Sequence, residues 1–315
     1  MRDITLLPKA HLHVHLESAI RPQTIAELGG PPEPQGPFDD FRAFADQRAQ
    51  VRDRLRTPGH FRRIAREFCQ DEAAQGTRYA EVTFTAAAHG ERLGQAEMPL
   101  EAVLEGLEEG RRYGIECRLL LDHSRRRPIE RLWRTLKLAT RYDEVIGIGV
   151  AGDESHPLTP FADVFDVARE AGVHLVHHAG ESAGPESIRE ALTAGHAERL
   201  GHGIRVMDDP DLVAEVAAAK IPLEVCPTSN VLLGLVGDLS AHPLPRMVAA
   251  GLTVTLNTDG ETTLAGEYEV ARSVFGFDDA ALAALAIASA RASFASEQVK
   301  REIVEGAERW LSTGL

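Results

Sequence analysis

The chain has 315 residues, longer than most single domains, but α/β barrels reach this size as one domain. It is 43% hydrophobic and 26% charged, as soluble globular proteins are, which argues against disorder. The formal net charge of -14 would repel a phosphate backbone, so we expect no nucleic-acid partner. Length alone leaves one domain or two open.

The cysteines and the apolar runs indicate a compartment. Cys69, Cys117 and Cys226 form no CxxC motif and are odd in number, which argues against a disulfide framework and a zinc ribbon. A strand-like segment begins almost at the first residue, without the apolar core of a secretory signal, and no run approaches about 20 apolar residues. We therefore expect a cytoplasmic protein with no membrane partner.

The first strand-like segment, residues 8–18 with the sequence PKAHLHVHLES, places three histidines at alternating positions. In a strand, His11, His13 and His15 share one face, while the apolar residues between them point the other way. Two neutral imidazoles on one rigid strand can chelate Zn²⁺. A strand whose histidines only form hydrogen bonds in a core is the alternative. The spacing does not decide which pair binds, and further ligands must come from elsewhere.

Residues 20–76 are predicted to be mainly helical, with helices at Arg21–Leu28 and Pro58–Gln75 and a proline-rich loop up to Pro37. Short apolar runs then alternate with helical patterns. Seven further strands are predicted at Tyr79–Phe84, Glu116–Leu121, Ile146–Val150, Val173–His177, Arg199–His202, Pro222–Val225 and Thr253–Asn257. The helical patterns between them are Leu100–Tyr113, Ile129–Arg141, Pro160–Ala171, Pro185–Ala194, Asp209–Ala219 and Pro243–Ala250.

Eight strands that alternate with helices predict right-handed crossovers and a parallel sheet, which closes naturally into a (β/α)₈ barrel, the TIM barrel. We expect one barrel domain over residues 1–315. An open doubly wound sheet is the alternative, but no GxGxxG motif or P-loop follows the first strand, which weakens the nucleotide-binding versions of that fold.

Reactive side chains follow four of the predicted strands, at the ends where barrel enzymes carry their chemistry. These residues are His13 and His15, then His177, His178 and Glu181, then His202, and finally Asn257 and Asp259. Each group alone has a structural explanation, such as a helix cap or a tight turn. Together they provide what a mononuclear zinc hydrolase needs: metal ligands, an open position for water and proton-transfer groups.

These motifs resemble those of the adenosine deaminase family of the amidohydrolase superfamily. The opening segment is similar to its Pro-Lys-x-x-Leu-His-x-His-Leu motif, and the resemblance runs from about residue 6 to about residue 296. The other matching motifs follow in the family's order: Gly147–Glu154, His178–Glu181, Glu198–Gly203, Cys226–Asn230 and Leu256–Asp259.

The resemblance implies a metal site of one Zn²⁺ per chain, held by His13, His15, His178 and Asp259. It implies that His11 is not a ligand and supports the site from behind. His177 and His178 are adjacent in a strand and must point to opposite faces. The motif selects His178, so we expect His177 to face the surrounding helices.

The resemblance also implies the reaction, attack of zinc-activated hydroxide on the amino-bearing carbon of a purine-type ring. Glu181 would donate a proton to ring N1, which requires a raised pKa. His202 would orient the hydroxide, and Asp259 would accept its proton. Gly152 would offer its backbone N–H to purine N3, where the absence of a side chain permits close approach, although a structural turn glycine is the alternative.

Several residues differ from the family pattern where the substrate is recognised. Glu17 and Ser18 replace the usual Asp-Gly, and adenine deaminases of this superfamily carry glutamate at the first of these positions. Gly260 replaces a second aspartate that helps to hold purine N7, and Glu261 is the candidate to take over that contact. Gly149 replaces a frequent aspartate, and Thr83 stands where Glu-x-Arg is common after the second strand.

The sequence therefore predicts a zinc-dependent deaminase of adenosine or a related 6-aminopurine nucleoside, acting in purine metabolism on a small-molecule substrate. Adenine, aminodeoxyfutalosine or another amino-heterocycle is the alternative substrate, and a metal-binding homologue with little catalysis is the alternative from another class. A two-metal amidohydrolase with a carboxylated lysine is disfavoured, because Ile146–Val150 contains no lysine. The oligomeric state is left open.

Overall fold

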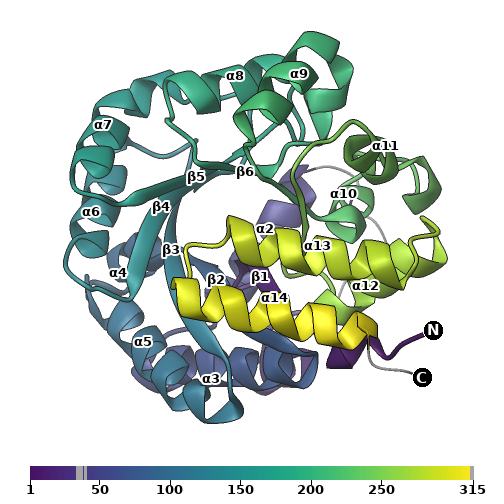
Figure 1. The fold of residues 1–315 in the computed structure, drawn as a ribbon. Helices are drawn as coiled ribbons and strands as arrows, with labels where there is room; N and C mark the ends of the chain where they lie inside the picture. Colours follow the sequence, from purple (N-terminus) through teal and green to yellow (C-terminus); the bar gives the residue numbers. More distant parts are fainter. Residues whose placement is uncertain (33–37, 39–40, 313–315) are drawn as a thin grey trace.

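The computed structural model describes residues 1–32, 38 and 41–312. Eight parallel strands form one sheet in which each strand pairs with its neighbours in the sequence, from β1 to β8. Figure 1 shows these strands curving around a common axis as a (β/α)₈ barrel. The strands are β1 Lys9–His15, β2 Thr77–Phe84, β3 Glu116–Ser124, β4 Val145–Ala151, β5 His174–Ala179, β6 Arg199–His202, β7 Leu223–Val225 and β8 Val254–Leu256.

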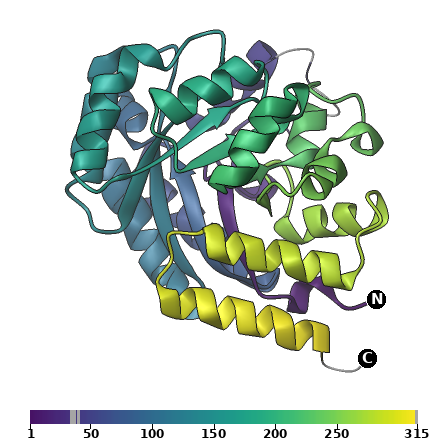
Figure 2. The same ribbon diagram turned by 45° about the horizontal axis from the view of Figure 1, so that its top comes forward.

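Helices lie around the outside of this sheet (Figure 2) and cover its apolar outer face. They are α1 Pro22–Glu27, α2 Phe41–Arg52, α3 Pro58–Ala74, α4 Ala86–Leu93, α5 Met98–Gly110, α6 Ile129–Ala139, α7 Ala162–Glu170, α8 Pro185–Thr193, α9 Pro210–Ala219, α10 Pro227–Leu232, α11 Leu244–Ala249, α12 Leu264–Ser273, α13 Asp279–Ala292 and α14 Glu297–Ser312. Among the described residues, no helix combines the length and the apolar character that crossing a membrane requires.

The seam between β8 and β1 is closed mainly by side chains and a single bridge. Asn257 Oδ1 accepts hydrogen bonds from the backbone N–H of Leu12 at 2.8 Å and of His13 at 3.1 Å. Asp259 forms an isolated parallel bridge with Val14, and α13 packs across β1 and β8. This closure brings the histidines of β1 next to the aspartate that follows β8.

The structure confirms the predicted barrel and excludes the open doubly wound sheet. The predicted strands match the observed ones to within a few residues. The prediction named no helix at α4, at α10 or after β8. One of the three helices after β8, α13, contains the run Ala-Ala-Leu-Ala-Ala-Leu-Ala-Ile-Ala and lacks the polar and apolar faces that identify a helix in a sequence. The proline-rich loop up to Pro37 lies partly outside the described residues.

Candidate active site

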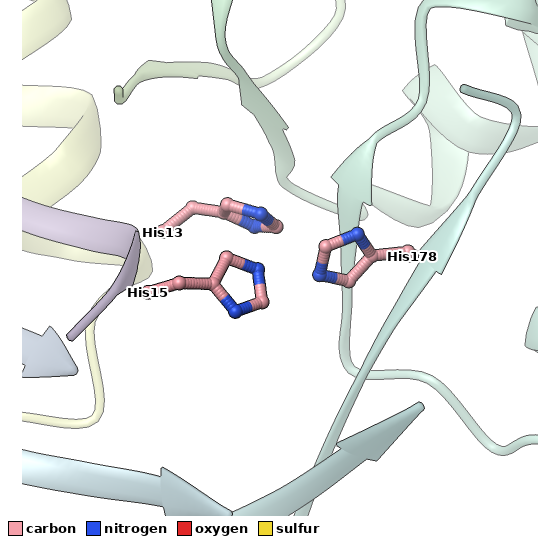
Figure 3. A group of neighbouring side chains, drawn as sticks. All are labelled: His13, His15 and His178. Carbon is pink, nitrogen blue, oxygen red and sulfur yellow. The ribbon is translucent and has the colours of Figure 1, made fainter. Parts of the chain in front are cut away.

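Three histidines from two strands converge inside the carboxyl end of the barrel. Figure 3 shows the rings of His13 and His15, from β1, facing His178 from β5. The ring centroids of His13 and His178 are 4.5 Å apart, and those of His15 and His178 are 5.1 Å apart. One ligand atom from each of the three residues lies within 4.8 Å of the other two. The strand alternation that placed these histidines on one face therefore produces a tight cluster.

Asp259 completes this cluster from the end of β8. Its Oδ1 lies 3.2 Å from His15 Nε2 and 3.5 Å from His13 Nε2. The Nε2 atom of His13 is buried without a hydrogen-bond partner, as is Nε2 of His202 at the end of β6. Buried polar atoms without partners are costly, and three imidazoles with one carboxylate are a donor set that zinc prefers. The residues therefore fit a bound zinc ion.

The electrostatics of the cluster favour a bound cation. Burial lowers the pKa of His178 well below its usual value, with a further contribution from the charge of His13. Burial also lowers the pKa of His13, but its interactions with Asp259 and Glu224 outweigh this and raise the pKa to about 10. The two carboxylates thus attract a positive charge to His13, and a metal ion would replace the proton there.

Two residues of the cluster have strained backbones. His202 has φ +62° and Asp259 has φ +63°, in the left-handed region that residues with a side chain rarely adopt. The distortion is retained because each side chain is held by partners. Ser229 Oγ donates to Asp259 Oδ2 at 2.7 Å, and the Asn230 side chain lies 3.3 Å from His202 Nδ1. Such strain concentrates at functional sites, where it aims side chains inward.

Glu181 lies beside the metal cluster, on the loop after β5. Its Oε1 is 3.5 Å from His202 Nε2, and its side chain is buried. Burial raises its pKa well above the usual value, and the charges of Asp259 and Glu154 add to this effect. Glu181 can therefore hold a proton near neutral pH, as a general acid must.

Glu154 fixes the loop that carries Glu181. Its carboxylate accepts hydrogen bonds from the backbone N–H of Gly180 at 2.8 Å, Glu181 at 2.9 Å and Ser182 at 2.8 Å, and from the hydroxyl of Ser187. The sequence analysis quoted Glu154 within a motif but gave it no role. A buried carboxylate that receives several backbone N–H bonds is rigidly held, so Glu154 fixes the position of Glu181.

A buried ion-pair network supports His13 from within the barrel. His13 Nδ1 lies 2.9 Å from Glu224 Oε2, and Glu224 also accepts from Arg199 Nε at 2.6 Å. Arg199 in turn pairs with Glu81, and all three charged side chains are buried. This network was not predicted from the sequence. The sequence contains one indication of it: Glu81 in β2 and Glu224 in β7 are charged residues within otherwise apolar strands.

Arg125 supports the opposite side of the cluster. Its guanidinium is buried and donates to the backbone carbonyls of His178 and His156. The next two residues, Arg126 and Arg127, are exposed. The basic run after β3 therefore combines one structural arginine with two that lie at the rim.

A cavity of about 200 Å³ opens in front of the cluster. Its lining includes His15, His178, Glu181 and Asp259, together with Glu17, Thr85, Asp122, Ser124 and Gly152. Gly152 has φ +93°, so a turn requires glycine here while its backbone also faces the cavity. An outer cavity of about 700 Å³ shares Thr85, Asp122, Ser124 and Gly152 with the inner one.

Glu17 faces the inner cavity, but its carboxylate already has hydrogen-bond partners within the protein. Its Oε1 accepts from the backbone N–H and the hydroxyl of Thr85 and lies 3.1 Å from His89 Nε2. Burial raises its pKa, but His89 and Thr85 outweigh this and lower the pKa to about 2. Glu17 is therefore an anion at the cavity wall.

Glu261 lies elsewhere. Its carboxylate pairs with Arg48 of α2 and lines a neighbouring cavity with Ser18 and Gly260, rather than the one that faces the histidines. A Cβ at Gly260 would lie 2.5 Å from Cβ of Ser18, so the side chain of Ser18 occupies the space that the family aspartate needs. Contact between Glu261 and the substrate stays a prediction, because in this structure the residue reaches the inner cavity only through Arg48.

His11 and His177 lie outside the cluster, as the sequence analysis expected. His11 contacts Glu72 at 3.1 Å and Thr258 at 3.1 Å, behind the metal cluster. His177 faces outward, with Nε2 2.9 Å from the Gly195 carbonyl and its ring against Phe165 of α7.

Known proteins are similar to this chain over nearly its whole length. A family model described as adenosine deaminase matches residues 8–310. An aminodeoxyfutalosine deaminase of Streptomyces coelicolor is 36% identical, over 98% of this chain and 86% of that protein. The adenine deaminase of Arthrobacter aurescens has a similar structure, with a TM-score of 0.91 and 31% identity over 98% of this chain and 100% of that one. An amidohydrolase of Burkholderia ambifaria, solved with bound Zn, has a TM-score of 0.85 and 26% identity over 98% of this chain and 94% of that one. The chain therefore belongs to the adenosine deaminase family and is a hydrolytic deaminase, as its motifs predicted.

Proposed function

We propose that this protein is a zinc-dependent deaminase of 6-aminopurines, with the free base adenine as its preferred substrate. The observation that carries this proposal is the convergence of three histidines and Asp259 beside a buried, protonatable Glu181 in one cavity. Metal ligands and a general acid at the same cavity are what hydrolytic removal of an amino group requires.

In this proposal His13, His15, His178 and Asp259 hold the metal, each through the ligand atom that faces the cluster. His13 and Asp259 already place their side chains within 3.5 Å of each other. A zinc ion held there would supply Lewis acidity, lowering the pKa of water to about 7. The bound zinc in the structurally similar Burkholderia protein supports this choice of metal.

In this proposal, each residue around the metal site has a different role in the proton transfers. Glu181, kept neutral by burial, donates to ring N1 and makes the neighbouring carbon more electrophilic. His202 is neutral because burial lowers its pKa to about 3, so it can accept a hydrogen bond from the attacking water and orient it. Asp259 takes up a proton from water. Water adds to C6, the amino nitrogen gains a proton, and ammonia leaves as the ring carbonyl forms.

The inner cavity favours a substrate about the size of a bare purine. Its volume is about 200 Å³, and Glu17 and Gly152 line it together with Glu181. Gly152 would offer its backbone N–H to ring N3. The similarity in structure to an adenine deaminase agrees with a free base rather than with the nucleoside that the motifs alone suggested first.

A second candidate substrate has a separate observation in its favour. The outer cavity of about 700 Å³ continues from the inner one, so a purine with a large substituent has room. An aminodeoxyfutalosine deaminase is among the relatives, at 36% identity. Aminodeoxyfutalosine is therefore the alternative that a substrate screen must include.

The test is a screen for ammonia release by the zinc-loaded protein on adenine, adenosine, AMP and aminodeoxyfutalosine. We expect the highest kcat/KM with adenine, and Glu181→Gln should lower kcat by about 10²- to 10⁴-fold, the usual contribution of a general acid. Equal zinc content in the two proteins is the control. Absence of turnover with every aminopurine would refute the proposal, and a preference for another member of the screen would correct the substrate.

A further inference from the structure

Asp122, near the end of β3, has no role in the chemistry described above. Its Cα pairs with Gly149 of β4, and its side chain lines both the inner and the outer cavity. The residue is half-buried at the junction of the two cavities. The carboxyl group therefore lies where the two cavities meet, together with Thr85 and Ser124.

No side-chain donor of the described residues forms a hydrogen bond with this carboxyl. Glu17 on the facing wall is different, because Thr85 and His89 hold it. Burial raises the pKa of Asp122 well above its usual value, and the charge of Glu17 adds to this, while the N–H of His123 opposes it. A polar group inside a ligand cavity without a protein donor is available to the ligand.

The position of Asp122 identifies the part of a purine that it would meet. The metal cluster is built from β1, β5 and β8, and it would face C6. Gly152, after β4, would face N3, and a Cβ at Gly152 would lie 3.5 Å from Ser124 Oγ. Asp122 and Ser124 are two positions apart in β3 and so point the same way. If Gly152 faces N3, Asp122 would therefore face the neighbouring N9 edge of the ring.

We propose that Asp122 accepts a hydrogen bond from the N9–H of the free purine base and thereby selects free bases over N9-substituted purines. This inference rests on the proposed function. An N9 substituent would remove the donor and press against the carboxyl group at the junction. A buried group built to bond one ligand hydrogen is left unpaired by the analogue that lacks it, which gives strong discrimination.

The experiment compares adenine with 9-methyladenine, which lacks the N9–H without adding a ribose. Both are assayed with the zinc-loaded wild type, Asp122→Ala and the near-isosteric Asp122→Asn. The matched control is Asp153→Asn, which alters a half-buried carboxylate that lines only the outer cavity. A second readout is the dissociation constant of hypoxanthine, measured by calorimetry, which reports binding without turnover.

We expect Asp122→Ala to lower kcat/KM for adenine at least about tenfold and to weaken hypoxanthine binding similarly. Its effect on 9-methyladenine should stay within about twofold, so the preference for adenine falls. Asp122→Asn keeps an oxygen acceptor and should lie between the two. An equal loss with both substrates, or no loss with adenine, would overturn the inference. Failure of the wild type to deaminate either purine would instead overturn the proposed function.

Discussion

Glu224 offers a way to separate metal binding from folding. It lies between His13, 2.9 Å away, and Arg199, 2.6 Å away, and is fully buried. Burial raises its pKa, but Arg199 and His13 outweigh this, so the pKa is lowered and the group is ionised. The carboxylate thus accepts a hydrogen bond from the Nδ1–H group of His13, which leaves Nε2 of His13 free to bind a metal.

Glu224→Gln removes this charge while keeping the shape of the side chain. Loss of a partner of this kind typically weakens metal affinity by about 10- to 100-fold. It also leaves Arg199 with one carboxylate instead of two. Breaking a buried ion pair costs about 3–5 kcal/mol of stability. Because Arg199 keeps one partner, we expect a loss of about 3 kcal/mol in the free energy of unfolding. Zinc affinity is measured by competition with a chromogenic chelator, and the free energy of unfolding by urea denaturation.

Glu81→Gln is the matched control. Glu81 pairs with the same Arg199 but does not contact His13 in this structure. It should therefore lose a similar amount of stability and bind zinc as the wild type does. If Glu224→Gln kept wild-type zinc affinity, or if both variants lost affinity equally, the assigned role of Glu224 in orienting His13 would be wrong.

Two further predictions concern stability. Burial raises the pKa of Glu267 to about 7, and its Oε2 has no partner. The folded state then binds more protons than the unfolded state between about pH 4.5 and 7, so this group lowers stability as the pH rises through that window. Glu267→Gln should therefore be more stable than the wild type at pH 8, by at most about 3 kcal/mol, and this gain in stability should shrink at pH 5. Urea denaturation at both pH values measures the difference. No gain in stability at pH 8 would contradict the prediction. Gly260→Ala should lower the melting temperature, because φ is +108° and the new Cβ meets Ser18, and adding Ser18→Gly should restore only part of the loss, since the φ strain remains. Complete restoration in a thermal melt would show that the clash alone matters.

Much of the fold, and the way in which the candidate metal ligands come together, could be predicted from local patterns. Alternating histidines in a strand, and reactive groups at strand ends, follow from backbone geometry and from the parallel topology. The choice of His13 and His15 over His11 did not follow from spacing and came from the resemblance. The structure adds its reason, because His11 is held by Glu72 and Thr258 behind the cluster.

What the sequence could not predict depends on contacts between distant segments. Glu154, after β4, binds the loop of Glu181 after β5, and Arg199 of β6 joins β2 to β7. The side chain of Ser18 fills the space beside Gly260, although the two residues are more than 200 positions apart in the sequence. No periodicity records these pairings, which appear only when the barrel closes.

The most direct test of the central claim is metal-dependent ammonia release from adenine. Protein stripped of metal by a chelator should release no ammonia, and one equivalent of zinc per chain should restore full activity. Turnover that survives complete metal removal, or a zinc-loaded protein that deaminates no aminopurine, would contradict the account.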